Sequence, residues 1–103
     1  MHVVTKVRSE SIDVVVTGTI KTVSDTQAIK EAVLKAHTSH IDVPIRLFLQ
    51  DSFIITSSLI GFLIKVIKMD HYALIVEVGS AELYEMLEDM SLIEIMNVRK
   101  ASV

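Results

Sequence analysis

Three consecutive hydroxyl residues, Thr56, Ser57 and Ser58, interrupt an apolar stretch that reads DSFIITSSLIGFLIKV over residues 51–66. No charged residue lies between Asp51 and Lys65. A hydroxyl just before a helix accepts hydrogen bonds from the amides of the first turn, so helix capping explains one of the three. The other two form either a short polar turn or an acceptor site for phosphate.

Phosphate on one of these hydroxyls would add about 1.5 to 2 negative charges at neutral pH. The amides and the dipole of a helix N-terminus stabilise an anion, so this is a favourable position for the group. Apolar Leu59, Ile60 and Phe62 follow directly. If they form an exposed patch, the new charge would oppose the docking of an apolar partner, and the segment would act as a switch.

Residues that could support catalysis are few. His37 and His40 are spaced to share a metal ion on a helix, but solvated histidines at a helix C-terminus, where positive charge suits the dipole, are the better explanation. Glu77 lies within an apolar run, where a position facing water accounts for it. The three glycines are too few for a phosphate-cradling loop, and no nucleophile elbow is present. We therefore expect no enzyme, no metal site and no cofactor.

Composition narrows the class of protein further. A chain of 103 residues is expected to form a single domain, residues 1–103, because it cannot hold two cores. Its net charge is −3 and its ten basic residues are dispersed, which argues against nucleic acid as a partner. The mean hydropathy of +0.51 exceeds what core filling requires, so we expect an apolar patch on the surface.

Neither a membrane span nor a secretion signal is expected. The longest uncharged run, residues 52–64, is shorter than the roughly 20 apolar residues that cross a bilayer. The first residues, MHVVTKV, lack the basic and apolar regions of a signal peptide, and there is no cysteine to form a disulfide. These features predict a cytoplasmic protein.

The first half of the chain predicts two strands and a helix. Residues 3–7 and 12–17 are rich in β-branched side chains, and the polar residues 8–11 between them are typical of a turn. Ser24 and Gln27 have the spacing of a capping box, so we expect a helix to begin there. The apolar residues from 28 to 36 recur at helical intervals and predict a helix with an apolar inner face.

The second half continues the alternation of strands and helices. Residues 45–49 and 73–78 predict buried strands, and a helix lies between them, starting near the hydroxyls. Ser80 is a candidate N-cap for a third helix, and residues 92–98 predict a last strand. Helix-linked strands pair in parallel through right-handed crossovers. The prediction is an α/β domain with a mixed sheet of about five strands and three or four helices on one or both faces.

The pattern of residues 53–63, the strand at 73–78, Ser80 and the sequence MLEDMSL at 86–92 resembles the STAS domain of bacterial anti-sigma factor antagonists. The run VVVTGTI at residues 14–20 is similar to an early strand of that family that ends in Gly-x-hydrophobic. The likeness covers nearly the whole chain. It implies a STAS-like α/β fold and a role in bacterial signal transduction and transcription regulation.

In that family an Asp-Ser-Ser-Gly-Leu-Gly motif lies between a strand and a helix, and its second serine is phosphorylated. Alignment of the apolar helical positions places this acceptor at Ser57. Ile55 and Ser58 then stand where the family has aspartate and glycine. A second register aligns Asp51 and Ser52 with the Asp-Ser-Phe-Ile sequence of stressosome scaffold members and moves the acceptor to Ser52. Thr56 and Ser58 are further alternatives.

The resemblance implies regulation by partner switching. The unphosphorylated domain would bind a protein that is both anti-sigma factor and serine kinase, and phosphorylation would release it. The residues implied in partner binding are Thr56, Ser57, Ser58, Leu59, Ile60 and Phe62. A phosphatase would be a further partner, a homodimer is compatible with this reading, and ATP would belong to the kinase. The alternative is a non-catalytic scaffold or assembly module in a stressosome-like particle or a transport complex.

Overall fold

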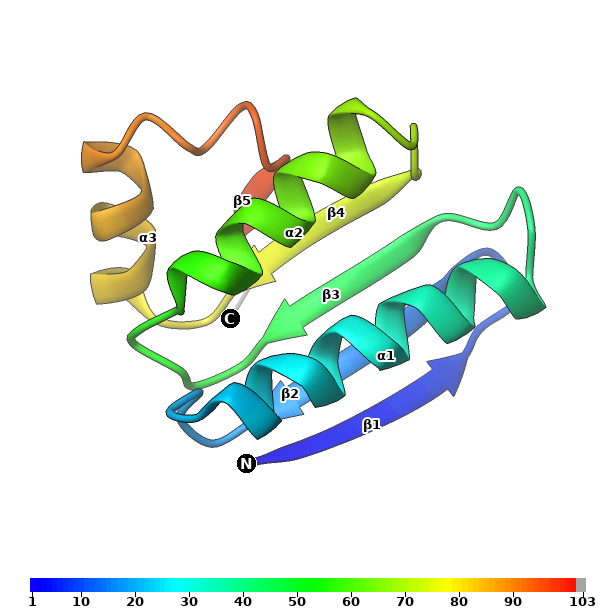
Figure 1. The fold of residues 1–103 in the computed structure, drawn as a ribbon, viewed down its shortest axis with the longest axis horizontal. Coiled ribbons are helices and arrows are strands. Elements are labelled where there is room, and N and C mark those ends of the chain that lie inside the picture. Colours follow the sequence, from blue (N-terminus) through cyan, green and yellow to red (C-terminus); the bar gives the residue numbers. More distant parts are fainter. Residues whose placement is uncertain (102–103) are drawn as a thin grey trace.

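Five strands form one mixed sheet in the order β1-β2-β3-β4-β5 in the computed structural model, which describes residues 1–101 (Figure 1). β1 is antiparallel to β2, and the later strands continue in parallel. The strands are β1 (His2–Val7), β2 (Ile12–Thr17), β3 (Ile45–Leu49), β4 (Leu74–Val78) and β5 (Val98–Lys100). The predicted α/β class and mixed sheet are confirmed, with β3 as the central strand.

In the described part of the chain, three helices connect the parallel strands: α1 (Val23–Ser39), α2 (Ser57–Lys68) and α3 (Ala81–Asp89). α1 and α2 lie side by side across one face of the sheet, and α3 packs beside β4 and β5 (Figure 1). Within residues 1–101, none of the helices combines the length and the apolar character that crossing a bilayer requires.

One face of the sheet is buried and the other is partly open. In β3 and β4, buried residues alternate with half-buried ones, which is the period of a strand with one covered face. The covered residues join the buried side chains of all three helices in a single apolar core. Among the described residues, the helices therefore pack on one face only.

Two loops meet where the parallel strands end. The amide of Gly18 donates to the carboxylate of Asp51 (2.6 Å), and the amide of Ile20 donates to the hydroxyl of Ser52 (3.2 Å). Gly18 has a φ of 85°, a backbone conformation that glycine adopts without strain. The β2–α1 loop is thus tied to the β3–α2 loop directly in front of α2.

The capping box of α1 lies two residues earlier than the sequence predicts. Thr22 is the N-cap, and its side chain accepts from the amide of Asp25 (3.0 Å) while the Asp25 carboxylate accepts from the amide of Thr22 (3.2 Å). The predicted box of Ser24 and Gln27 is therefore wrong. The shorter aspartate closes the same reciprocal pair that the prediction assigned to glutamine.

The predicted last strand at residues 92–98 is also wrong. Residue 91 and residues 93–97 lie in turns, and Ser91 and Asn97 have positive φ angles of 59° and 52°. Met96 is fully buried, so this segment fills the core through turns instead of strand alternation. The strand β5 begins only at Val98.

Candidate functional site

The N-terminus of α2 gives each of the three hydroxyls a different role. Thr56 is the N-cap, and its Oγ1 accepts from the amide of Leu59 (3.2 Å). The same oxygen shares a hydrogen bond with the hydroxyl of Thr26 in α1 (2.8 Å). Capping, expected for one of the three hydroxyls, thus falls to Thr56.

Ser58 is held by a lysine of the neighbouring helix. Lys30 Nζ donates to Ser58 Oγ (2.9 Å) and lies 5.8 Å from the centre of the Phe62 ring. Lys30 therefore brings a positive charge from α1 to the first turn of α2. The sequence did not single out this residue because a lysine on an outward helical position looks like an ordinary solvated charge.

Ser57 is the first residue of α2 and is exposed. Within residues 1–101 its hydroxyl makes no hydrogen bond with another side chain or with the backbone. Of the three hydroxyls, it is the one that is both accessible and not engaged in holding the structure together. It is therefore available to another protein.

Ser52 is fully buried and serves as an internal anchor. Its hydroxyl accepts from the amide of Ile20 and donates to the carbonyl of Ile54 (2.8 Å). A kinase could reach it only after these bonds had opened. Asp51 likewise uses its carboxylate to accept from the amide of Gly18.

Leu59 does not belong to an exposed patch. It is fully buried in the core, while Ile60 and Phe62 are half-buried at its margin. Leu59 is the third residue of the helix and faces the sheet. The helical spacing of the apolar residues did not by itself decide whether Leu59 faces the sheet or solvent. The condition that Leu59, Ile60 and Phe62 together form an exposed patch is therefore not met.

Two other apolar residues are exposed in the loop that precedes the hydroxyls. Phe53 and Ile54, in the loop before α2, have 51% and 42% of their surface accessible. Val23, at the start of α1, is also exposed, and it lines a small cavity with Thr56 and Ser58. The apolar surface patch predicted from the mean hydropathy stays a prediction, with which the exposure of Phe53, Ile54 and Val23 is consistent.

The cavity beside Ser58 lies between the N-terminal turns of α1 and α2. It has a volume of about 160 Å³ and is lined by Lys21, Thr22, Val23, Thr26, Gln27, Lys30, Thr56 and Ser58. Two lysines and several hydroxyls give it a basic, polar wall. An anionic group on this turn would therefore meet favourable charge from the helix dipole and from Lys30.

The two histidines considered as metal ligands are not brought together with other ligands. The His37 ring stacks on Tyr72, with centroids 3.7 Å apart and an angle of 13° between the planes. His40 is exposed at the end of α1. In the part of the chain that the structure describes, no three His, Cys, Asp or Glu side chains are grouped to bind a metal ion.

Comparison with known proteins shows the fold and leaves the family open. No family model matches this chain, and no curated protein matches it. The NMR structure of the protein TM1081 is similar over 94% of this chain and 79% of its own length, with a TM-score of 0.69 and 14% sequence identity. At this identity the likeness establishes a shared α/β architecture.

Proposed function

We propose that this chain is a STAS-type partner-switching regulator controlled by phosphorylation of Ser57. Without phosphate it binds an anti-sigma factor that is also a serine kinase, or a similar regulatory protein, and with phosphate it releases that partner. The observation that carries the proposal is the exposed Ser57 on the first turn of α2, which follows exposed Phe53 and Ile54 closely in the chain. The domain itself is non-catalytic and works in the cytoplasm.

The exposed apolar side chains supply the docking energy in this proposal. Phe53 and Ile54 would be covered by the partner, and burying apolar surface contributes roughly 25 cal/mol per Å². Ser57 would lie within or beside the contact, because it follows these residues across a short loop. Binding therefore depends on the absence of charge at this turn.

Phosphate would reverse this preference. It would add about 1.5 to 2 negative charges that an apolar contact would have to desolvate. On the free domain the same group would be stabilised by the unpaired amides of α2 and by Lys30, which already reaches Ser58. The phosphorylated state is thus favoured when the partner is absent.

The alternative acceptors are supported less well by their surroundings. Ser52 is buried behind two hydrogen bonds, and Thr56 caps the helix. Ser58 is exposed but bonded to Lys30. Ser57 is accessible without any change of the fold. We therefore prefer the alignment that places the acceptor serine at Ser57 over the one that places it at Ser52.

The test is phosphopeptide mapping and intact mass of the protein purified from its native cells. Wild type, Ser57→Ala, Ser52→Ala and Ser9→Ala should be compared, where Ser9 is an exposed serine in the β1–β2 turn and serves as the control. We expect phosphate on the wild type and on the Ser52 and Ser9 variants, and none on Ser57→Ala. A protein that co-purifies with Ser57→Ala should be lost from Ser57→Asp.

Each contrary result has a specific meaning. Phosphate that disappears only from Ser52→Ala would refute Ser57 and support the scaffold register. No phosphate under any growth condition, together with a large particle in solution, would replace the switch with the assembly module. A monomer or dimer that carries phosphate at Ser57 agrees with the proposal.

A further inference from the structure

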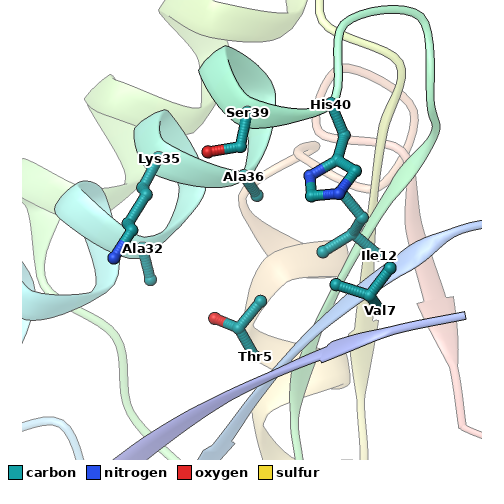
Figure 2. Close-up of a pocket in the computed structure, with 8 residues that line it drawn as sticks. All are labelled: Thr5, Val7, Ile12, Ala32, Lys35, Ala36, Ser39 and His40. Carbon is teal, nitrogen blue, oxygen red and sulfur yellow. The ribbon is translucent and has the colours of Figure 1, made fainter.

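A second surface lies at the opposite end of α1 from Ser57. It is a groove of about 280 Å³ between α1 and β1, which we call the edge groove, and it is lined by Thr5, Val7, Ile12, Ala32, Lys35, Ala36, Ser39 and His40 (Figure 2). Its floor is apolar, and 63% of the Val7 surface is accessible. At this volume it has room for an apolar side chain.

The strand beside this groove is an edge of the sheet. β1 pairs with β2 on one side only, and no other described strand lies on its free side. The amide of Arg8 donates to the carbonyl of Ser11 (2.8 Å). Hydrogen-bonded pairs alternate along antiparallel strands, so Lys6 and Val4 also bond to β2.

The remaining residues of β1 point their backbone groups outward. Val3, Thr5 and Val7 alternate with the residues that bond to β2, so their amides and carbonyls face the free edge. Thr5 and Val7 also place their side chains in the edge groove. A row of free backbone groups and an apolar hollow therefore lie side by side.

We propose that β1 and the edge groove bind an extended acidic peptide segment of a partner protein. The peptide would add to the sheet as a sixth strand by hydrogen bonding to Val3, Thr5 and Val7. One of its apolar side chains would fill the hollow between β1 and α1. Strand addition of this kind combines affinity from the main chain with specificity from the pockets for alternate side chains.

The basic residues of β1 and of the edge groove indicate which class of peptide binds there. Residues 1–9 contain basic His2, Lys6 and Arg8 and no acidic residue. Arg8 is already ion-paired with Asp13 of β2 (3.1 Å), so His2 and Lys6 carry the complementary charge. The rim of the groove adds Lys35 and His40, and none of its lining residues is acidic. A peptide with acidic residues beside its apolar side chains is therefore the complementary ligand.

The same charges argue against a second copy of this chain at β1. Antiparallel pairing of two β1 strands would bring the basic residues of both copies together without an acidic partner in either strand. The inference does not depend on the proposed function, because Ser57 lies at the other end of α1.

The experiment is an NMR titration of the ¹⁵N-labelled protein with the pentapeptide acetyl-Glu-Val-Thr-Leu-Glu-amide. We expect saturable amide shifts at Val3, Thr5 and Val7 and on the groove side of α1. Two control peptides accompany it, one with lysine in place of both glutamates and one N-methylated at valine and leucine. The lysine peptide should bind more weakly, and N-methylation should weaken binding at least about tenfold, because it removes the main-chain donors.

Variants locate the site independently of the peptide. Lys35→Gln should weaken binding of the acidic peptide about two- to fivefold, as expected for loss of one exposed charge pair. Lys68→Gln, which removes an exposed lysine at the end of α2, should leave binding unchanged. Ala32→Leu should fill the groove and abolish the shifts at its rim while the spectrum stays that of a folded domain.

Three outcomes would overturn the inference. The first is an absence of shifts at β1, and the second is equal binding of the acidic and lysine peptides. The third is a concentration-dependent shift of β1 amides without peptide, which would identify a second copy as the occupant.

Discussion

Asp25 holds the first turn of α1 through two backbone amides. Its carboxylate accepts from Lys21 (2.9 Å) and from Thr22 (3.2 Å). The hydrogen bond from the amide of Lys21, together with that from Thr22, lowers the pKa of Asp25, although desolvation acts in the opposite direction. Because the folded state favours the ionised form, the carboxylate stabilises the fold at neutral pH, and this contribution is lost as the pH falls through the lowered pKa.

The pH dependence of stability should therefore change when this residue is altered. Asp25→Asn should lower the melting temperature at pH 7, and the difference from wild type should shrink as the pH falls below about 4, where a free aspartate protonates. Thermal unfolding followed by circular dichroism between pH 7 and pH 2.5 measures this. Asp89→Asn, at the exposed end of α3, is the control. A difference that stays constant with pH would contradict the role of the charge.

At the scale of elements, two glycines differ in the space that a side chain would have: Gly61 has open space beside it, and Gly79 has none. Gly61 lies in α2, and a methyl group built there would meet nothing within 4 Å. Gly79 follows β4, and the same methyl group would lie 2.0 Å from the carbonyl oxygen of Gln50. β4 thus passes close to the end of β3, and no side chain fits between them.

Alanine at these two positions should shift stability in opposite directions. Gly61→Ala should raise the free energy of unfolding by about 0.5 to 1 kcal/mol, because alanine restricts the unfolded chain and favours helix. Gly79→Ala should lower it by about 1 to 3 kcal/mol, because the backbone of Gln50 must move. Urea unfolding of both variants measures the difference. Equal effects of the two substitutions would show that the contact between β4 and Gln50 is unimportant.

The sequence predicted the elements that have a strong period and missed those that depend on contacts distant in the chain. The runs at residues 12–17 and 45–49 give strands with the predicted bounds, because their β-branched and apolar residues fit a covered sheet. Residues 92–97 are also largely apolar, yet they pack into the core through turns. Ser57 was identified as a candidate from its neighbours, but the contact of Lys30 with Ser58 joins residues 28 apart and leaves no local signal.

At the scale of the whole molecule, the open face of the sheet carries a chain of ion pairs. Asp13 Oδ2 lies 3.1 Å from Arg8 Nε and 3.4 Å from Arg46 Nη1, and Arg46 Nη2 donates to Glu77 Oε1 (2.9 Å). The hydrogen bond to Glu77 is the main cause that raises the pKa of Arg46, so this guanidinium stays charged. It also covers the Phe48 ring, at 4.7 Å from its centre. Arg46 links three strands across a face that no described helix covers.

Replacing Arg46 should lower the free energy of unfolding more than replacing Arg8. Arg46→Met should lower the free energy of unfolding by about 1 to 3 kcal/mol, because Asp13, with only 8% of its side chain exposed, and Glu77 both lose a charged donor. Arg8 is more exposed, so Arg8→Met should cost less than about 1 kcal/mol. Urea unfolding of the two variants measures the order. A larger loss for Arg8→Met would show that Asp13 depends on the hairpin instead of the central strand.

The hydrogen bonds from Gly18 and Ile20 to Asp51 and Ser52 have a consequence for how an enzyme would meet this domain. They fasten the start of the loop that leads to Ser57, and Thr56 fastens its end by capping α2. A kinase that bound the segment around Ser57 in an extended conformation would have to break these hydrogen bonds, and the loop would lose its ordered structure. The kinase would then recognise the folded surface around Ser57. A short peptide with the sequence of residues 51–63 would be a poorer kinase substrate than the intact domain.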